Sequence, residues 1–510
     1  MDAVERHVLE PDASFDGGDL DCGNGLLLLI RQHIDPLARG QLLEFRSTEI
    51  SVEEDFPAWC RMTGNELVSL VRRGRERSFL VCKGRLAERV ERAAPLPRRF
   101  VSERGAIAVS IPAVLPAPAP APVIAPLSVM GVGSWPRPRW MREAIHAHME
   151  GRLSDAEFDA TSEDATRLAV EAQLRAGVDV VTDGEQRRDN YASFVGGRLD
   201  NCQLIPLTDL LPLVDDPEVF EAELRSLDVP ASDVRHPAVF GRLGRSRPLA
   251  VHELAFARSL TDRPVKVALP GPYLLTRTMW MECISDRAYR SREDLATDIV
   301  RVLREEIHFL LAAGASLVQL DEPVLSEVVF TGAKSSRSFM CGALSEKGDA
   351  LTELAFARAL IAEVVAGLPP SRLALHVCRG NWTRDERAAL AGDYRPLLPL
   401  LATVGVGTLF LELCTPRAGE IDVLKDLPAS CRIGVGVVNQ KLERVETPEE
   451  IVVQARRAVE LFGADRVLLT PDCGFATFAD SPVASARVAE DKLRAIARAA
   501  AILAGRAPGQ

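Results

Sequence analysis

The stretch "RLALHVCRGN", residues 372–381, places an imidazole and a thiol at the end of a short apolar run. Alternate side chains of a strand point to the same face, so His376 and Cys378 are expected to lie side by side. A half-buried histidine beside an ordinary core cysteine is the simpler interpretation of this pair alone. A metal site is the alternative, and it requires ligands from other segments.

Two further apolar runs supply such ligands. Glu412 lies near the end of "TLFLELC", and Cys473 follows "RVLLTPD". Together with His376 and Cys378 they give one imidazole, two thiolates and one carboxylate, a set that suits Zn²⁺. The net charge of such a centre is about −1, so it can bind a substrate thiol, lower its pKa and leave the sulfur electron-rich. A purely structural zinc held by the same four ligands is the alternative.

These residues need a scaffold that brings strand ends together. Eight short apolar runs are predicted to be strands, and near-continuous apolar character is typical of strands that are buried on both faces. Helical segments are predicted between them at 155–176, 293–313, 350–367, 449–462 and 483–504. This alternation predicts an α/β fold of the (β/α)₈ TIM-barrel type, with a doubly wound open sheet as the alternative.

Every predicted strand ends in polar or conformationally special residues. These are Ser134, Asp183 with Glu185, Pro270-Gly271-Pro272, Asp321 with Glu322, His376 with Cys378, Glu412, Asn439, and Asp472 with Cys473. The carboxyl ends of barrel strands meet at one mouth, where barrel enzymes hold their active sites. The predicted fold therefore gathers these side chains in one place.

The chain divides into three parts. Residues 112–126, "PAVLPAPAPAPVIAP", are too rich in proline for a helix or a sheet and predict an extended polyproline segment. With the charged stretch before it, this segment forms a predicted semi-rigid linker at 91–126. Residues 1–90 predict a small two-layer α+β sandwich domain, and residues 127–510 predict the barrel.

Composition narrows the class of protein. The chain has 510 residues, so two or more domains are expected, and its net charge of −11 disfavours nucleic acid and membrane surfaces as partners. The acidic N-terminus lacks the apolar core of a secretory signal, and no run of about 20 apolar residues is present. A reducing, cytoplasmic location is expected, where free cysteines are typical.

At this point the motifs resemble a known family. In order, "GSWP", "TDGEQRRDN", "LPGP", "QLDEP", "HVC", "LELCTP" and "PDCGF" resemble the C-terminal catalytic barrel of cobalamin-independent methionine synthase. The resemblance implies methyl transfer to the sulfur of homocysteine, with zinc held by the four predicted ligands. It also implies that Ser134 helps to bind the amino-acid carboxylate, and that Glu185 and Asp321 bind the ammonium.

The resemblance leaves several points open. Ion pairing of Glu185 with Arg187 or Arg188, and a simple strand cap at Asp321, are the structural alternatives. Lys441 stands where full-length enzymes carry a proton-donating histidine, so it is a catalytic candidate beside Asp321, and the donor is either a methyl-folate or a methyl-corrinoid. A zinc alkyltransferase for another small thiol or a carrier-bound sulfur is the alternative function.

The front part resembles the TusA/SirA-like sulfur-carrier fold through "LDCGNGLLLLI" and "EEDFPAWCRMTGNEL". That family carries a reactive Cys-Pro at the start of its first helix, where the helix N-terminus lowers the thiol pKa. Here the stretch reads "GNGLLLLI", so Cys22 is the candidate carrier thiol. The resemblance implies a sulfur-relay protein as a possible partner, and a non-catalytic sulfur-carrier adaptor is the second alternative function.

Overall fold

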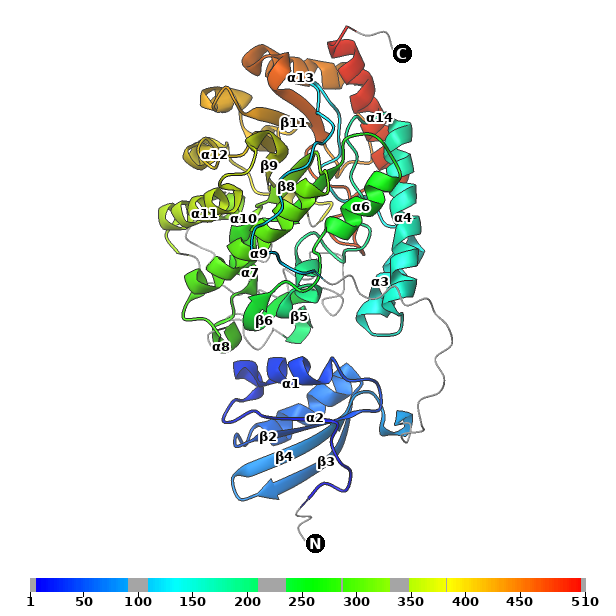
Figure 1. The fold of residues 1–510 in the computed structure, drawn as a ribbon, viewed down its shortest axis with the longest axis vertical. Coiled ribbons are helices and arrows are strands. Elements are labelled where there is room, and N and C mark those ends of the chain that lie inside the picture. The colour runs from blue at the N-terminus through cyan, green and yellow to red at the C-terminus, as the bar shows by residue number, and fades with distance from the viewer. Residues whose placement is uncertain are drawn as a thin grey trace.

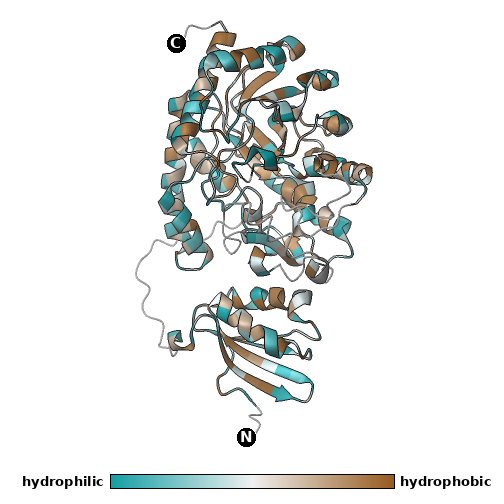
Figure 2. Ribbon diagram, turned by 180° about the vertical axis from the view of Figure 1, so that it is seen from behind, coloured by the Kyte–Doolittle hydropathy of each residue, from teal (hydrophilic) through white to brown (hydrophobic). Residues whose placement is uncertain are grey.

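The computed structural model describes residues 6–89, 109–209, 235–285, 288–330, 348–381 and 383–505. A small part, residues 6–89, and a large part, from residue 127 on, are stacked end to end (Figure 1). In Figure 2 the strands inside the large part are mostly hydrophobic, whereas its outer helices alternate between hydrophobic and hydrophilic residues. This pattern places the core around the sheet and turns one face of each outer helix to solvent.

The small part packs two helices on a four-stranded sheet in the order β1-β2-β4-β3, with β1 parallel to β2 and the other pairs antiparallel. The rings of Phe45, Phe56 and Phe79 meet between the layers, with centroids 4.8 to 5.5 Å apart. Its elements are β1 (Ala13–Asp16), a π-helical turn (Cys22–Leu26) that continues into α1 (Leu27–Ile34), β2 (Leu42–Ser47), α2 (Val52–Thr63), β3 (Glu66–Arg73) and β4 (Glu76–Cys82).

Helix α1 contacts a hairpin of the large part (Figure 1). This hairpin consists of the antiparallel strands β5 (Asp200–Pro206) and β6 (Arg235–Gly244). The Arg31 guanidinium donates to Asp209 over 2.5 Å, and the amide of Gln203 donates to Asp35 over 2.8 Å. Both ends of the first bond are largely buried, so this contact is a packed interface.

Six parallel strands form the main sheet, in the order β12-β11-β10-β9-β8-β7. Neighbours in the sheet are neighbours along the chain, so the described strands lack the reversal of order that defines a doubly wound sheet. Every residue of these six strands is buried except Arg432, the first residue of β11. The strands are β7 (Lys266–Pro270), β8 (Leu317–Asp321), β9 (Leu373–Val377), β10 (Thr408–Leu411), β11 (Arg432–Val438) and β12 (Val467–Pro471).

The first two predicted strands lie between the two edges of this sheet, but they pair only through single bridges. Val129 pairs in parallel with Leu469 of β12, Met130 with Val180, and Val181 with Val265 beside β7. The backbone N–H of Val129 donates to the carboxylate of Asp179, which takes the place of a ladder hydrogen bond. This side-chain bond explains in part why the segments do not form regular strands.

Five long helices match the predicted segments closely: α4 (Asp155–Ala176), α9 (Arg292–Ala312), α11 (Ala350–Val365), α13 (Pro448–Phe462) and α14 (Ala486–Leu503). Side-chain caps begin each of them, for example the reciprocal bonds between Ser154 and Glu157 at α4. Shorter helices are α3 (Arg139–Met149), α6 (Val251–Ser259), α7 (Pro272–Met279), α8 (Glu282–Ser285), α10 (Val324–Phe330) and α12 (Leu398–Leu401). Among the described helices, none combines the length and apolar character that crossing a bilayer requires.

The Ala/Pro segment at 112–126 has no helix or strand, as predicted, but it is fastened to the large part. Its carbonyl oxygens accept hydrogen bonds from Arg372 at Ala119 and from Arg432 at Ile124. Ile124 is buried in a cluster with Phe410 and other strand residues. The described half of the predicted linker, residues 109–126, is therefore held against the large part and is not a free spacer. We call this segment the strap. Residues 90–108 lie outside the described part of the chain.

Candidate metal centre and its pocket

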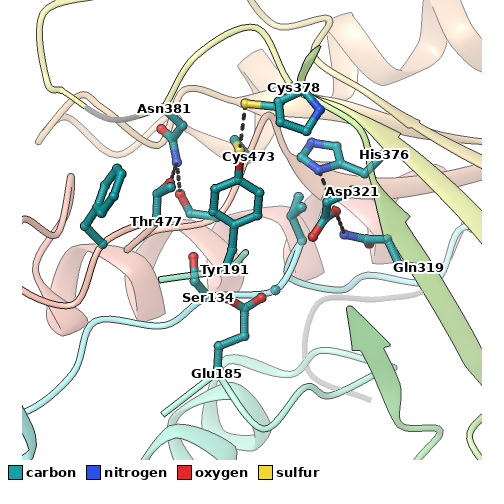
Figure 3. Close-up of a pocket in the computed structure, with 15 residues that line it drawn as sticks. Ser134, Glu185, Tyr191, Gln319, Asp321, His376, Cys378, Asn381, Cys473 and Thr477 are labelled. Carbon is teal, nitrogen blue, oxygen red and sulfur yellow. Dashed lines mark hydrogen bonds and ion pairs between the residues drawn. The ribbon is translucent and has the colours of Figure 1, made fainter. Parts of the chain in front are cut away.

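A pocket lies where the ends of β8, β9 and β12 meet the loops after residues 128–132 and 179–183 (Figure 3). Its empty space, about 540 Å³, includes the part that is open to solvent. Its lining consists of Val132, Gly133, Ser134, Glu185, Tyr191, Gln319, Asp321, Pro323, His376, Cys378, Asn381, Cys473, Gly474, Thr477 and Phe478.

Three of the four predicted metal ligands come together. One atom each of Cys378, Glu412 and Cys473 lies within 4.8 Å of the others, and all three residues are buried. The two sulfur atoms are 3.5 Å apart. Their mutual hydrogen bond and burial raise the pKa of Cys473 well above its ordinary value. Two thiols and a carboxylate at this separation form a set that a divalent cation would bind with loss of the thiol protons.

His376 lies apart from this group of three. Its Nδ1 is 3.1 Å from Oδ1 of Asp321, and its Nε2 is buried without a hydrogen-bond partner. A buried ring nitrogen without a partner is costly, and metal-binding histidines commonly use their other nitrogen to contact a carboxylate. The unpartnered Nε2 therefore fits a fourth ligand, although the structure does not place it within 4.8 Å of the other three.

The loop that carries Glu412 is held in place by backbone bonds. The N–H of Arg379 donates to Glu412 Oε1 over 2.8 Å. Asp472, next to Cys473, accepts the N–H groups of Leu413 and Cys414. These bonds tie the chain after β10 to the chain after β12 and so fix the spacing of the carboxylate and the thiol.

Glu185 points into the pocket from the opposite wall (Figure 3). Its backbone is left-handed, with φ of 55°, and its Oε2 is buried without a hydrogen-bond partner. Burial raises the pKa of this carboxyl to about 7. Arg188 pairs instead with Glu253 over 2.6 Å, and Arg187 approaches Asp159, so neither predicted ion pair forms.

Two glycines make room for the polar walls. A Cβ atom on Gly133 would lie 2.2 Å from the Glu185 carboxylate, and one on Gly474 would lie 2.3 Å from the Ser134 hydroxyl. Ser134 Oγ accepts a hydrogen bond from the N–H of Ala476 over 3.2 Å. The serine is thus oriented by the loop after β12.

Asp321 and its neighbour Glu322 do different things. Asp321 lines the pocket, whereas Glu322 accepts the N–H groups of Tyr273 and Leu274 at the start of α7. The strand-cap alternative therefore applies to Glu322, whose burial raises its pKa to about 8. Several lining residues were not predicted from the sequence. Gln319 lies on β8 within "QLDEP", where only the acidic residues drew a prediction, and the others lie in loops: Tyr191, Asn381, Thr477 and Phe478.

Three predicted residues lie outside the pocket lining. One is Glu412, which belongs to the ligand group described above. Lys441 is buried, and among the described residues its Nζ has no hydrogen-bond partner. Cys22 is the first residue of the turn that leads into α1, but it is packed in the core of the small part. Burial, together with Asp55 and Asp21, raises its pKa to about 12, the reverse of what a carrier thiol needs.

The large part is similar in sequence to proteins of a known family. Residues 127–211 and 219–500 match the family described as "Cobalamin-independent synthase, Catalytic domain". A methionine synthase of Saccharolobus solfataricus is 28% identical over 348 residues, which is 67% of this chain and 86% of that protein. A methionine synthase of Sulfurisphaera tokodaii is 28% identical over 352 residues, which is 69% of this chain and 86% of that protein.

Two solved structures share the fold. The B12-independent methionine synthase from Shewanella sp. W3-18-1, in complex with selenomethionine, superimposes with a TM-score of 0.56 at 24% identity, over 75% of this chain and 98% of that one. A putative vitamin-B12-independent methionine synthase from Listeria monocytogenes superimposes with a TM-score of 0.51 at 20% identity. The superposition covers 75% of this chain and 99% of that one. The family match covers most of the chain and spans every residue of the pocket, and we conclude that the chain belongs to the cobalamin-independent synthase family, through its catalytic domain.

Proposed function

We propose that this protein is a cobalamin-independent methionine synthase that transfers a methyl group to the sulfur of homocysteine. The main support is that ligand atoms of Cys378, Glu412 and Cys473 lie within 4.8 Å of one another. This group is at one side of a pocket whose other walls hold Glu185 and Asp321. Family membership and the names of the relatives support the same reaction.

The proposed metal is zinc, bound by these three residues with His376 Nε2 as the fourth ligand. Two sulfurs and a nitrogen favour zinc over magnesium or calcium, which prefer oxygen. When bound, zinc would supply a Lewis acid that lowers the pKa of the substrate thiol. Asp321 would hold His376 through Nδ1 and so present Nε2 toward the sulfurs.

The substrate's amino-acid end is proposed to bind across the pocket. Among the residues that the structure describes, Glu185 Oε2 has no hydrogen-bond partner, and Asp321 is a second carboxylate on a different strand end. Two carboxylates that approach from different sides suit an ammonium, because each forms a charge-assisted hydrogen bond. Ser134 is proposed to donate a hydrogen bond from its hydroxyl group to the substrate carboxylate.

In the proposed reaction, the thiol loses its proton, a bond forms between sulfur and the methyl carbon, and the bond from that carbon to the donor breaks. The donor leaves with the electron pair. A methyl-folate takes up a proton at the nitrogen that carried the methyl group, whereas a methyl-corrinoid leaves as the Co(I) form and takes up none. The protein's part is to hold the sulfur in line with the methyl group and to exclude water. Lys441 is not part of the pocket lining, which leaves its proposed role in protonation without geometric support.

The proposal extends to the architecture. The bridges at Val129, Met130 and Val181 join both edges of the main sheet, which supports a closed eight-stranded (β/α)₈ barrel at 127–510. Residues 1–90 are proposed to be a TusA/SirA-like domain, since they carry two helices on a four-stranded sheet. Because Cys22 is buried, we assign this domain a binding role and no sulfur-transfer step. A cytoplasmic location is part of the same proposal.

The test is a methyl-transfer assay on the zinc-loaded protein, with methyl-folate and methylcobalamin as donors and methionine detected by mass spectrometry. Homocysteine should be methylated, and Cys473→Ser should abolish turnover together with stoichiometric zinc. Other small thiols in the same assay separate this proposal from the related alkyltransferases. Turnover with none of the thiols would favour the adaptor alternative.

A further inference from the structure

A lysine lies buried beneath the pocket, and the proposed reaction does not use it. Lys266, the first residue of β7, is fully inaccessible to solvent. Its Nζ donates to the carbonyl oxygen of Val132 and to Oε1 of Gln319, each over 2.7 Å. It also lies 4.3 Å from the ring centre of Phe410, above the apolar cluster that fills this end of the sheet.

This lysine fixes the orientation of an amide. An ammonium can only donate hydrogen bonds, so Gln319 must turn its oxygen toward Lys266. The amide nitrogen then faces the other way and donates to Oδ1 of Asp321 over 2.6 Å. Lys266 thus acts on Asp321 through one intermediate side chain, without touching it.

The consequence for Asp321 is that its two oxygens have separate partners. Oδ1 is engaged by Gln319 and by Nδ1 of His376. Among the described residues, Oδ2 has no hydrogen-bond partner, and Asp321 lines the pocket (Figure 3). Oδ2 is therefore the oxygen that remains for a ligand.

Charge supports the same arrangement. Asp321, Glu185 and Cys473 all act to raise the pKa of Lys266, although burial outweighs them and lowers it to about 7. Its positive form compensates two carboxylates that would otherwise repel each other in a buried site.

We propose that Lys266 is a positioning residue for substrate selection. Through its hydrogen bond to Gln319 it holds Oδ1 of Asp321 and leaves Oδ2 for the ammonium of an amino-acid thiol. This inference rests on the proposed function, since it takes homocysteine as the ligand. It predicts a loss that is specific to thiols with an amino group.

The experiment compares the binding of L-homocysteine and 4-mercaptobutanoate, the same thiol without its amine, to the zinc-loaded protein by calorimetry. In Lys266→Met, homocysteine affinity should fall about ten- to hundredfold, as for a charge-assisted hydrogen bond, and 4-mercaptobutanoate affinity by less than about threefold. Lys492→Met is the matched control, because Lys492 is equally buried but pairs with Glu446 away from the pocket. It should leave the ratio of the two affinities unchanged.

Gln319→Met gives an independent arm with Lys266 intact, and it serves even if Lys266→Met fails to fold. It should lower the affinity ratio in the same direction, and the double variant should lose little more than either single one. An unchanged ratio in either folded, zinc-loaded variant, or fully additive losses, would overturn the role of Lys266. If the unaltered protein itself does not prefer homocysteine, the ammonium site of the proposed function fails instead.

Discussion

Replacing Glu185 by glutamine should stabilise the protein at alkaline pH while it damages substrate binding. Burial raises the pKa of Glu185 from 4.5 to about 7, so the folded state holds a proton that the unfolded chain releases. At about 1.4 kcal/mol per pH unit, the ionised carboxylate costs about 3 kcal/mol of folding free energy above pH 7. The cost falls as the pH drops below 7 and is gone below pH 4.5, where both states are protonated.

The assay is urea unfolding of Glu185→Gln and the unaltered protein at pH 8 and pH 5. Without ligand, the variant should be more stable by up to about 3 kcal/mol at pH 8 and by less than about 1 kcal/mol at pH 5. Its affinity for homocysteine should fall at pH 8. Glu143→Gln, on the exposed face of α3, is the control and should show no pH-dependent difference. A variant no more stable at pH 8, or equally stabilised at both pH values, would refute the reasoning.

Four further predictions follow from the site and the strap. Cys473→Ser should strongly weaken zinc binding while the fold is kept, so equal zinc content measured by atomic absorption would contradict the ligand assignment. Asp321→Asn should lower homocysteine turnover about ten- to hundredfold and that of an amine-free thiol much less; equal losses would mean that no ammonium is recognised. Cys22→Ser should leave methyl transfer unchanged, since its thiol is buried, and loss of turnover with zinc retained would assign it a sulfur-handling role. Ile124→Ala should destabilise the large part by about 2–5 kcal/mol in thermal or urea unfolding, whereas a free linker would give no change.

The parts of the fold that the sequence predicted well are those with local signals. Helix α4 begins and ends at the predicted residues because Ser154 and Glu157 form a capping box and Gly177 takes the left-handed conformation that ends it. The predicted strand ends also supplied several residues that the structure brings to one pocket, among them Glu185, Asp321 and Cys473. Family resemblance then assigned roles to Ser134, Glu185 and Asp321 that spacing alone could not give.

What the sequence could not give depends on long-range contacts. A proline-rich segment lacks donors of its own, so nothing local indicates that Arg372 and Arg432 would bond its carbonyl oxygens. Likewise, Cys22 shortly before α1 suggested a thiol near a helix terminus, and only the packing of the small part shows that Cys22 is buried. Pocket residues such as Tyr191 and Asn381 come from loops whose course no periodicity predicts.

The bridge from Val129 to Leu469 also has a consequence for how the protein is made. The ribosome releases residue 129 long before residue 469, so the first segment of the large part must wait for the last strand before it can pair. Cys473 emerges just after that strand and well after Cys378. We therefore expect that Cys378 and Cys473 cannot bind a metal ion together until synthesis is nearly complete. Metal loading and the joining of the sheet edges would then become one late step, and a chain stalled before it would hold Cys378 without its partner thiol.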